Sequence, residues 1–294
     1  YSNVYDMVKV YSRSLASLGL KCNDKVVICL PSGIEMVEVI LSCFDLGLIA
    51  VPISIHLSQN ERMSIMDKIK PVMIITNWKV RNLFSKSSYL LSFIEELPNA
   101  SSGCSILENE YEKNNDDICS IMLTSGTTSR PKAVQLTYGN FEMSCRNWNG
   151  FLEFKENDQF LCCLPMNHIG GLAVIMRALI FGFSVNLISN FDAINVKTAL
   201  QDNPVSIISL VPTMLRRILL LEDGLESLKS LRYILLGGGP SPESLLDYCI
   251  LNQLPIVKVY GMTETCSGTF GLKVLDEPHN KLYAGRPFSG IKAW

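Results

Sequence analysis

Residues 124–132 combine hydroxyl side chains, a glycine and a lysine in the order Thr-Ser-Gly-Thr-Thr-Ser-Arg-Pro-Lys. A glycine in such a loop lets a ligand approach the backbone, and here that residue is Gly126. Hydroxyl groups and backbone N–H groups donate hydrogen bonds, and Lys132 adds a cation. A bound triphosphate needs these groups, so the loop is a candidate phosphate site. Its hydroxyl donors are Thr124, Ser125, Thr127 and Thr128.

The surroundings of the loop favour this interpretation without proving it. A β-rich run at 118–123 precedes it and a helix-like stretch at 138–151 follows, which predicts the strand–loop–helix arrangement in which phosphate loops work. The Walker loop is excluded because Pro131 and Ala133 break its Gly-Lys-Ser/Thr ending. A polar surface turn has the same composition, so the segment alone leaves both interpretations open.

The composition describes a folded protein that acts on small molecules. The 294 residues are 48% hydrophobic and 18% charged, which excludes a disordered chain and allows one large or two ordinary domains. A net charge of −2, without a block of Lys or Arg, predicts no nucleic-acid partner and no anionic membrane surface. The ten cysteines form no Cys-x-x-Cys pair and lie mostly in apolar runs, so we expect reduced core residues.

The ends and the apolar runs of the chain bear on its location. The sequence begins at Tyr1 with no charged and apolar leader, so no secretory signal is visible and we expect a cytoplasmic protein. The apolar run at 172–183 is interrupted by Arg177 and Gly182, and no run reaches the roughly 20 residues that would span a bilayer. A membrane span is therefore not expected.

Short β-branched runs alternate with amphipathic stretches of helical length. This βαβα order predicts parallel sheets with helices on both faces, and ligands in such folds collect beyond the carboxyl ends of the strands. The expected strands are 26–30, 51–53, 72–76, 160–164, 185–188, 206–209, 233–236 and 256–260, and the expected helices are 33–46, 60–69, 168–181, 193–200, 213–221 and 242–251.

Three further segments follow expected strands. The turn at 235–240 carries Gly237, Gly238, Gly239 and Pro240, which a flat ligand can approach, although an ordinary strand-to-helix turn explains it equally well. The segment at 259–265 places an aromatic ring, hydroxyls and a carboxylate close together, a set that suits a base, a phosphate and Mg²⁺. The segment at 164–171 puts a histidine beside two glycines, where a structural or capping role is the alternative. Their remaining candidate residues are Tyr260, Gly261, Thr263, Glu264, His168, Gly170 and Gly171.

Taken together and in this order, the four segments resemble the acyl-adenylate-forming superfamily of acyl-CoA synthetases, peptide-synthetase adenylation domains and luciferases. The resemblance covers nearly the whole chain. Within the superfamily the chain looks most like the o-succinylbenzoate-CoA ligases of menaquinone biosynthesis. The stretches that carry this narrower likeness are 164–172, 177–182, 234–240 and 260–267, including Cys266-Ser267 after the Thr-Glu-Thr segment.

The resemblance implies an α/β fold, namely the large N-terminal domain of that superfamily, with mostly parallel sheets flanked by helices. It implies a first α/β subdomain over 1–117, incomplete at its N-terminus, and a second over 118–275 that carries the ATP and acyl sites. The composition of 98–117, with a polar Asn-Ala-Ser-Ser-Gly segment and an acidic run, itself predicts an exposed connection between the two halves. Residues 276–294 would begin a small β-barrel subdomain, and the C-terminal lid domain would be absent.

The resemblance also implies roles for the candidate residues. ATP, Mg²⁺ and coenzyme A would be the cofactors and acceptor, with a small carboxylic acid as substrate. The loop at 124–132, including Lys132, would hold the β- and γ-phosphates, and Glu264 would ligate Mg²⁺. Thr263 would lie near the α-phosphate, and Tyr260 with 237–240 would enclose the adenine. His168 would line the acyl pocket.

The succinylbenzoate interpretation requires a donor or cation for a second carboxylate. Arg177 is the nearest candidate in the sequence, with Gly170 and Gly171 beside the acyl pocket, and Leu172, Val211 and Met214 are guesses for an apolar wall. A surface or snorkelling arginine is an equally good interpretation of Arg177.

Two departures from the superfamily pattern affect the expected activity. Ser129 stands where the loop usually has a glycine, so a positive φ there would strain the loop, and Ala133 replaces another common glycine. With the lid and its lysine missing, we expect the chain to bind ATP weakly and to turn over slowly or not at all.

Other functions remain open on the sequence. Another acyl- or aryl-CoA ligase and an adenylation domain that loads a carrier protein share much of the pattern. A nucleotide-binding remnant without enzymatic activity is the non-enzyme alternative. The sequence leaves the oligomeric state undecided, including a homo-oligomer.

Overall fold

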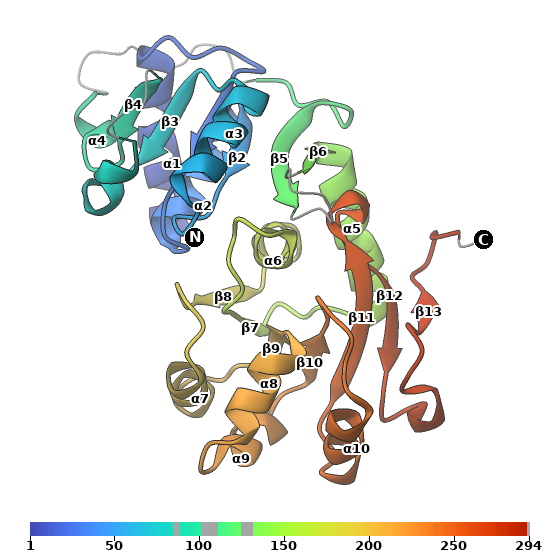
Figure 1. Cartoon of the computed structure of the whole chain (residues 1–294). Helices are drawn as coiled ribbons and strands as arrows, with labels where there is room; N and C mark the ends of the chain where they lie inside the picture. Colours follow the sequence, from blue (N-terminus) through green and yellow to red (C-terminus); the bar gives the residue numbers. More distant parts are fainter. Residues whose placement is uncertain (85–88, 101–110, 125–131, 293–294) are drawn as a thin grey trace. The chain divides into compact units, whose positions relative to one another are not determined.

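A computed structural model describes residues 1–84, 89–100, 111–124 and 132–292. By its internal contacts the chain divides into two compact units, Tyr1–Gly139 and Asn140–Trp294. Each unit is built around one sheet (Figure 1). The expected α/β class with mostly parallel sheets is confirmed. No helix in the described ranges is both long and apolar enough to cross a membrane.

The first unit contains a six-stranded sheet in the order β4-β3-β1-β2-β5-β6. Its neighbours pair in parallel except for β5 and β6, which are antiparallel. The strands are β1 (Lys25–Ile28), β2 (Ile49–Pro52), β3 (Met73–Thr76), β4 (Leu90–Phe93), β5 (Ile118–Thr124) and β6 (Lys132–Thr137), and the helices are α1 (Ser2–Ser17), α2 (Ile34–Asp45), α3 (Gln59–Ile69), α4 (Leu97–Ala100) and the 3₁₀ turn η1 (Trp78–Phe84).

The second unit contains a seven-stranded sheet in the order β13-β12-β11-β10-β9-β7-β8, parallel from β8 to β11 and antiparallel beyond. Its strands are β7 (Gln159–Cys162), β8 (Ser184–Leu187), β9 (Ile207–Leu210), β10 (Tyr233–Leu236), β11 (Ile256–Met262), β12 (Ser267–Lys273) and β13 (Arg286–Pro287). The remaining elements are α5 (Tyr138–Leu152), α6 (Ile169–Phe181), α7 (Ala193–Asp202), α8 (Pro212–Leu219), α9 (Gly224–Lys229), α10 (Glu243–Leu251), η2 (Thr263–Thr265) and η3 (Pro278–Asn280).

Side chains of the second sheet alternate between two hydrophobic clusters. Phe160 and Cys162 pack with α5 and α6, whereas Leu161 and Cys163 pack with α7, α8, α9 and α10. Successive side chains of a strand point to opposite faces, and helices cover both faces here. The continuous apolar runs of the sequence follow from this double coverage.

The loop at 124–132 has a different setting from the expected strand–loop–helix. Thr124 ends β5, Lys132 begins β6, and the two residues face each other across an antiparallel pair. The segment is therefore bordered by two strands, and α5 follows only after β6. The sequence did not predict this strand because residues 132–137 are polar in part, and their burial is low and irregular.

The division between the units also differs from the expected boundary after residue 117. Ser120 on β5 pairs with Ala50 on β2, so β5 and β6 belong to the first sheet, and the division by contacts falls at Gly139. At the other end, β12 and β13 extend the second sheet as antiparallel strands. That residues 276–294 begin a β-barrel stays a prediction.

Polar contacts fix the base of the second sheet. Asp158, which is 3% exposed, accepts hydrogen bonds from the Lys155 N–H at 2.8 Å and the Ser206 hydroxyl at 2.8 Å, and it pairs with Arg232.

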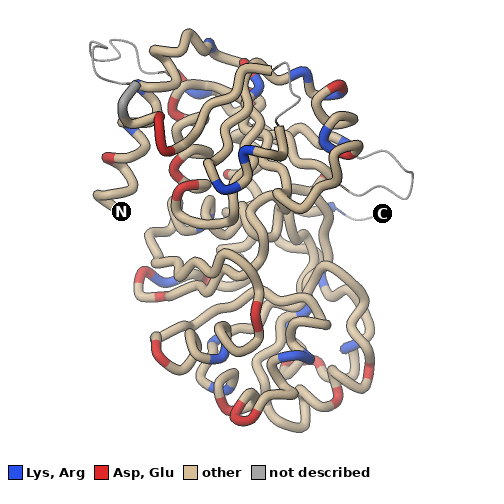
Figure 2. The backbone as a smooth tube through the Cα atoms, turned by 60° about the vertical axis from the view of Figure 1, so that its left-hand side comes forward, with Lys and Arg blue, Asp and Glu red and all other residues tan. Residues whose placement is uncertain are grey.

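Elsewhere the charges of both signs are interspersed along each unit (Figure 2). The nine cysteines in the described ranges form no disulfide bond, and eight of them are buried, as expected of core residues.

Candidate functional site

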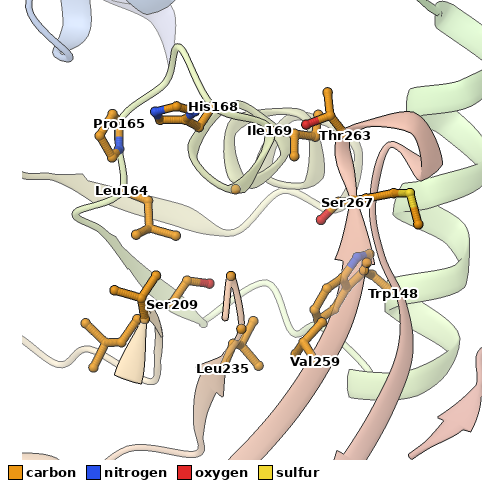
Figure 3. A pocket seen from close by; sticks show the side chains of 18 of the residues that line it. Trp148, Leu164, Pro165, His168, Ile169, Ser209, Leu235, Val259, Thr263 and Ser267 are labelled. Carbon is orange, nitrogen blue, oxygen red and sulfur yellow. The ribbon is translucent and has the colours of Figure 1, made fainter. Parts of the chain in front are cut away.

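The loops at the carboxyl ends of the second sheet enclose a cavity of about 560 Å³ (Figure 3). Its walls come from the segment after β7, the strand ends of β9, β10 and β11, and helices α5 and α6. In Figure 3, His168 and Thr263 lie on one side of the space, opposite Leu235 and Val259. Parallel strands end at the same edge of a sheet, which explains why segments far apart in sequence meet here.

His168 stands where the chain turns into α6. It occupies the N-cap position without a side-chain capping bond, so the capping alternative is not realised. The imidazole is exposed at the rim of the cavity, yet the surrounding protein desolvates it enough to lower its pKa below the ordinary value of 6.5. Gly170 also lines the cavity, whereas Gly171 packs behind it against the backbone of Pro165.

Arg177 lies inside the cavity wall, on α6, with only 2% of its surface exposed. The surface interpretation of this residue is therefore wrong. Burial lowers the pKa of Arg177 to about 10, which still leaves the guanidinium charged near neutral pH. No Asp or Glu stands among the described residues that line the cavity, so no carboxylate there balances this charge.

Two contacts orient the guanidinium. Nη2 of Arg177 donates a hydrogen bond to the Ser267 hydroxyl at 2.8 Å, and the guanidinium carbon lies 4.2 Å from the centroid of the Trp148 ring. Trp148 is on α5 and Ser267 begins β12, and both line the cavity. Sequence reasoning gave neither residue a role in the site, because Trp148 belongs to no motif and Ser267 entered only as part of the family likeness at 260–267. A tryptophan on the apolar face of α5 was the only signal.

An unusual backbone carries Ser267. Cys266 and Ser267 adopt backbone φ values of +52° and +100°, which residues other than glycine rarely adopt. Ser144 on α5 donates a hydrogen bond to the Cys266 carbonyl at 2.6 Å and so holds this turn. The cost of the conformation and its place in the cavity wall mark the turn as a functional feature.

The glycine turn after β10 and the segment after β11 border the same cavity. Gly237, Gly238, Gly261 and Thr263 line it, and Gly238 has a φ of +75°, which explains the need for glycine there. Nearby, Tyr260 is half exposed at 51%, with its ring edge-on to Phe270. The glycine turn and the Tyr-Gly-Met-Thr-Glu-Thr segment, 23 residues apart at Gly238 and Gly261, thus meet at one edge of the sheet.

Other predicted site residues lie elsewhere. Glu264 is exposed on η2 beside the rim, and Pro240 lines a separate cavity of about 510 Å³ against α8 and α10. Within the described ranges, no three His, Cys, Asp or Glu side chains form a metal-binding group. Of the guessed apolar wall, Val211 and Met214 line the cavity and Leu172 does not.

The candidate phosphate loop is described only at its borders. Thr124 is partly buried and Lys132 is exposed. Ser125, Gly126, Thr127, Thr128 and Ser129 lie outside the described residues, so their predicted contacts remain predictions.

Relatives identify the group of proteins to which this site belongs. The chain is 35% identical over 268 residues to a 2-succinylbenzoate–CoA ligase of Bacillus cereus, covering 91% of this chain and 54% of the relative. It is 32% identical over 290 residues to the protein of that name from Oceanobacillus iheyensis, covering 98% and 59%. The chain thus spans little more than half the length of these curated relatives.

Solved structures agree with this grouping. The o-succinylbenzoate CoA synthetase (MenE) of Bacillus subtilis, in complex with the acyl-adenylate intermediate OSB-AMP, matches with a TM-score of 0.88 at 31% identity, covering 98% of this chain and 59% of that one. The same protein in complex with ATP and magnesium ion matches at 0.88 and 32%, covering 98% and 60%. The inhibitor-bound N-terminal domain of FACL13 from Mycobacterium tuberculosis shares the fold, with a TM-score of 0.89 at 24% identity over 98% of this chain and 75% of that one.

The family match covers the chain almost completely, over residues 1–293, and its description is AMP-binding enzyme. Together with the two relatives above 30% identity, this match decides the assignment. The chain belongs to the family of AMP-binding enzymes.

Proposed function

We propose that this chain is the nucleotide- and acyl-binding part of an acid–thiol ligase that activates 2-succinylbenzoate with ATP and transfers it to coenzyme A. A carboxylate oxygen attacks the α-phosphorus of ATP, the bond to pyrophosphate breaks, and an acyl-adenylate forms. A thiolate then attacks the acyl carbon, and AMP leaves with the bonding electron pair. The proposed reaction takes place in the cytoplasm.

The observation that carries the proposal is the buried charge of Arg177. A guanidinium that is 2% exposed and has no carboxylate beside it in the cavity is costly to bury. A substrate that brings its own negative charge offsets this cost. 2-Succinylbenzoate carries two carboxylates, so one can be activated while the other pairs with Arg177. A fatty acid has no group for this position.

The remaining residues have proposed roles in holding the nucleotide. Gly237 and Gly238 leave the strand end open for the adenine, and the half-exposed ring of Tyr260 offers a surface for stacking, worth about 1–3 kcal/mol. Thr263 would contact the α-phosphate, and His168 would lie beside the reacting carboxylate. The loop at 124–132 would hold the β- and γ-phosphates.

Glu264 is the proposed protein ligand of Mg²⁺. An exposed single carboxylate fits this ion, which usually takes one or two protein carboxylates and completes its shell with phosphate oxygens and water. When bound, the ion would neutralise charge on the phosphate oxygens.

Binding of acyl-adenylate mimics tests the proposal. Two acyl sulfamates of adenosine are compared by calorimetry on the wild-type chain: the 2-succinylbenzoyl compound, and the 4-oxo-4-phenylbutanoyl compound, which lacks only the ring carboxylate. We expect the first to bind at least tenfold more tightly, and Arg177→Met to reduce this difference. Equal affinities on the wild-type chain would contradict the assigned acid while leaving the family intact.

A further inference from the structure

Two N–H donors in the cavity wall have no partner. Among the described residues, Nε1 of Trp148 and Nε of Arg177 are buried side-chain nitrogens without a hydrogen bond. Both side chains are 2% exposed and both line the cavity. An unpaired buried donor is costly, so two of them on neighbouring side chains of one cavity wall indicate a group of the ligand that accepts from both.

The two donors belong to one stacked pair. The guanidinium carbon of Arg177 lies 4.2 Å from the centroid of the Trp148 ring, a cation–π contact that is strongest where water is excluded. Nη2 of Arg177 donates to the Ser267 hydroxyl at 2.8 Å, whereas Nε has no hydrogen-bond partner. The stack therefore fixes the plane of the guanidinium, and one N–H donor of each side chain stays unpaired.

A glycine makes room for the indole. A Cβ at Gly268 would lie 2.6 Å from Cζ2 of Trp148 and 2.4 Å from Cγ1 of Val259, both shorter than real contacts. The ring thus occupies the space that a side chain at position 268 would need. Trp148 on α5 and Gly268 on β12 therefore pack directly against each other in the cavity wall.

We propose that Trp148 is a further specificity-determining residue of the acyl cavity: its indole N–H, together with Nε of Arg177, donates to the carboxylate of the substrate that is not activated. The ring positions the guanidinium, and Gly268 leaves the space for the ring. This inference rests on the proposed function, since it names a second donor for the same carboxylate. It predicts selection for acids with an anionic group on the aromatic ring.

The indole N–H gives a direct readout. The chain has three tryptophans, so a ¹H–¹⁵N spectrum of the ¹⁵N-tryptophan-labelled protein contains three indole signals, and Trp148→Phe and Trp78→Phe assign them. We expect the 2-succinylbenzoyl sulfamate to move the Trp148 signal downfield and the 4-oxo-4-phenylbutanoyl sulfamate to leave its proton shift nearly unchanged. A new hydrogen bond to a carboxylate causes the first effect, whereas packing alone does not.

Affinities of the variants separate donation from packing. Trp148→Phe keeps an aromatic ring beneath Arg177 and removes the N–H, so we expect at least about tenfold weaker binding of the 2-succinylbenzoyl sulfamate, because a hydrogen bond to a charged group is stronger than one between neutral groups. Its affinity for the compound without the ring carboxylate stays within twofold of wild type. Trp78→Phe, at an exposed ring stacked on Phe93 in the other unit, leaves both affinities unchanged.

Failure of this inference differs from failure of the proposed function. If the wild-type chain prefers the 2-succinylbenzoyl sulfamate while its Trp148 signal stays in place and Trp148→Phe binds equally well, the N–H is not a donor and the inference is overturned. If the wild-type chain does not distinguish the two sulfamates, the assigned acid is wrong and the inference falls with it. A melting temperature of Trp148→Phe equal to that of the wild-type chain shows that the variant is folded.

Discussion

The Ser267 hydroxyl accepts a hydrogen bond from Nη2 of Arg177 at 2.8 Å and thereby connects β12 to α6. Ser267 makes this contact from a backbone with a φ of +100°. A side chain at such a φ is strained, and the contact shows why the strain is tolerated: the hydroxyl must reach the guanidinium.

Replacement of Ser267 separates the strain from the hydrogen bond. Ser267→Ala loses the hydroxyl and keeps the Cβ, whereas Ser267→Gly loses both. We expect Ser267→Gly to be about 1 kcal/mol more stable than Ser267→Ala, because glycine adopts positive φ without a steric cost. Urea unfolding of the two variants measures the difference. Equal free energies of unfolding would show that the turn is relaxed.

Gly268 and Gly150 offer opposite outcomes for the same substitution. Gly268→Ala places a Cβ against Trp148 and Val259, so we expect a loss of about 1–3 kcal/mol in the free energy of unfolding. Gly150 lies within α5, with open space at its Cβ position, so Gly150→Ala is expected to stabilise by about 0.5–1 kcal/mol. Urea midpoints test both. A neutral Gly268→Ala would mean that the indole can move aside.

Asp158 is expected to be the most sensitive polar position of the second unit. Asp158→Ala leaves the Ser206 hydroxyl and the Arg232 guanidinium without their carboxylate, and breaking a buried pair costs about 3 kcal/mol. The exposed pair of Glu142 and Arg146 serves as a control, since Glu142→Ala is expected to change stability by less than about 0.5 kcal/mol. Similar losses in both variants would argue against a special role of burial at Asp158.

The lowered pKa of His168 predicts a pH dependence of stability. Above the ordinary value of 6.5 the imidazole is neutral in both states. Below it the unfolded chain binds a proton before the folded chain does, so the free energy of unfolding falls as the pH drops from 6.5 toward the folded-state pKa. Between pH 7.5 and 5.5 we expect wild type to lose more stability than His168→Gln. Urea unfolding at each pH measures this change, and an equal loss of unfolding free energy in the two proteins would refute a lowered pKa of His168.

Most of the fold was predictable because its signals are local. The run at 233–236 and the amphipathic stretch at 242–251 coincide with β10 and α10, since burial on both sheet faces imposes continuous apolar strands. The strand β6 was missed because Lys132 and Gln135 are exposed and the run lacks an apolar pattern. Its pairing with β5 is decided by chain contacts that no local pattern records.

The candidate site likewise has parts that the sequence predicted and parts that it did not. The order of its motifs along the chain determined the family, since the glycine turn and the segment at 259–265 are recognisable from residue types alone. The sequence also indicated His168 as a cavity residue. It left the position of Arg177 open, because an arginine in an apolar helix fits both a surface and a buried location.

Only the tertiary structure decided what surrounds that arginine. Trp148, Arg177 and Ser267 are far apart in sequence and come from α5, α6 and β12, and their contacts exist because two helices pack on one face of the sheet beside its antiparallel edge. Residue type and spacing describe backbone paths and phosphate or adenine motifs, which are local. The proposed recognition of a second carboxylate depends on side chains that packing brings together from distant parts of the sequence.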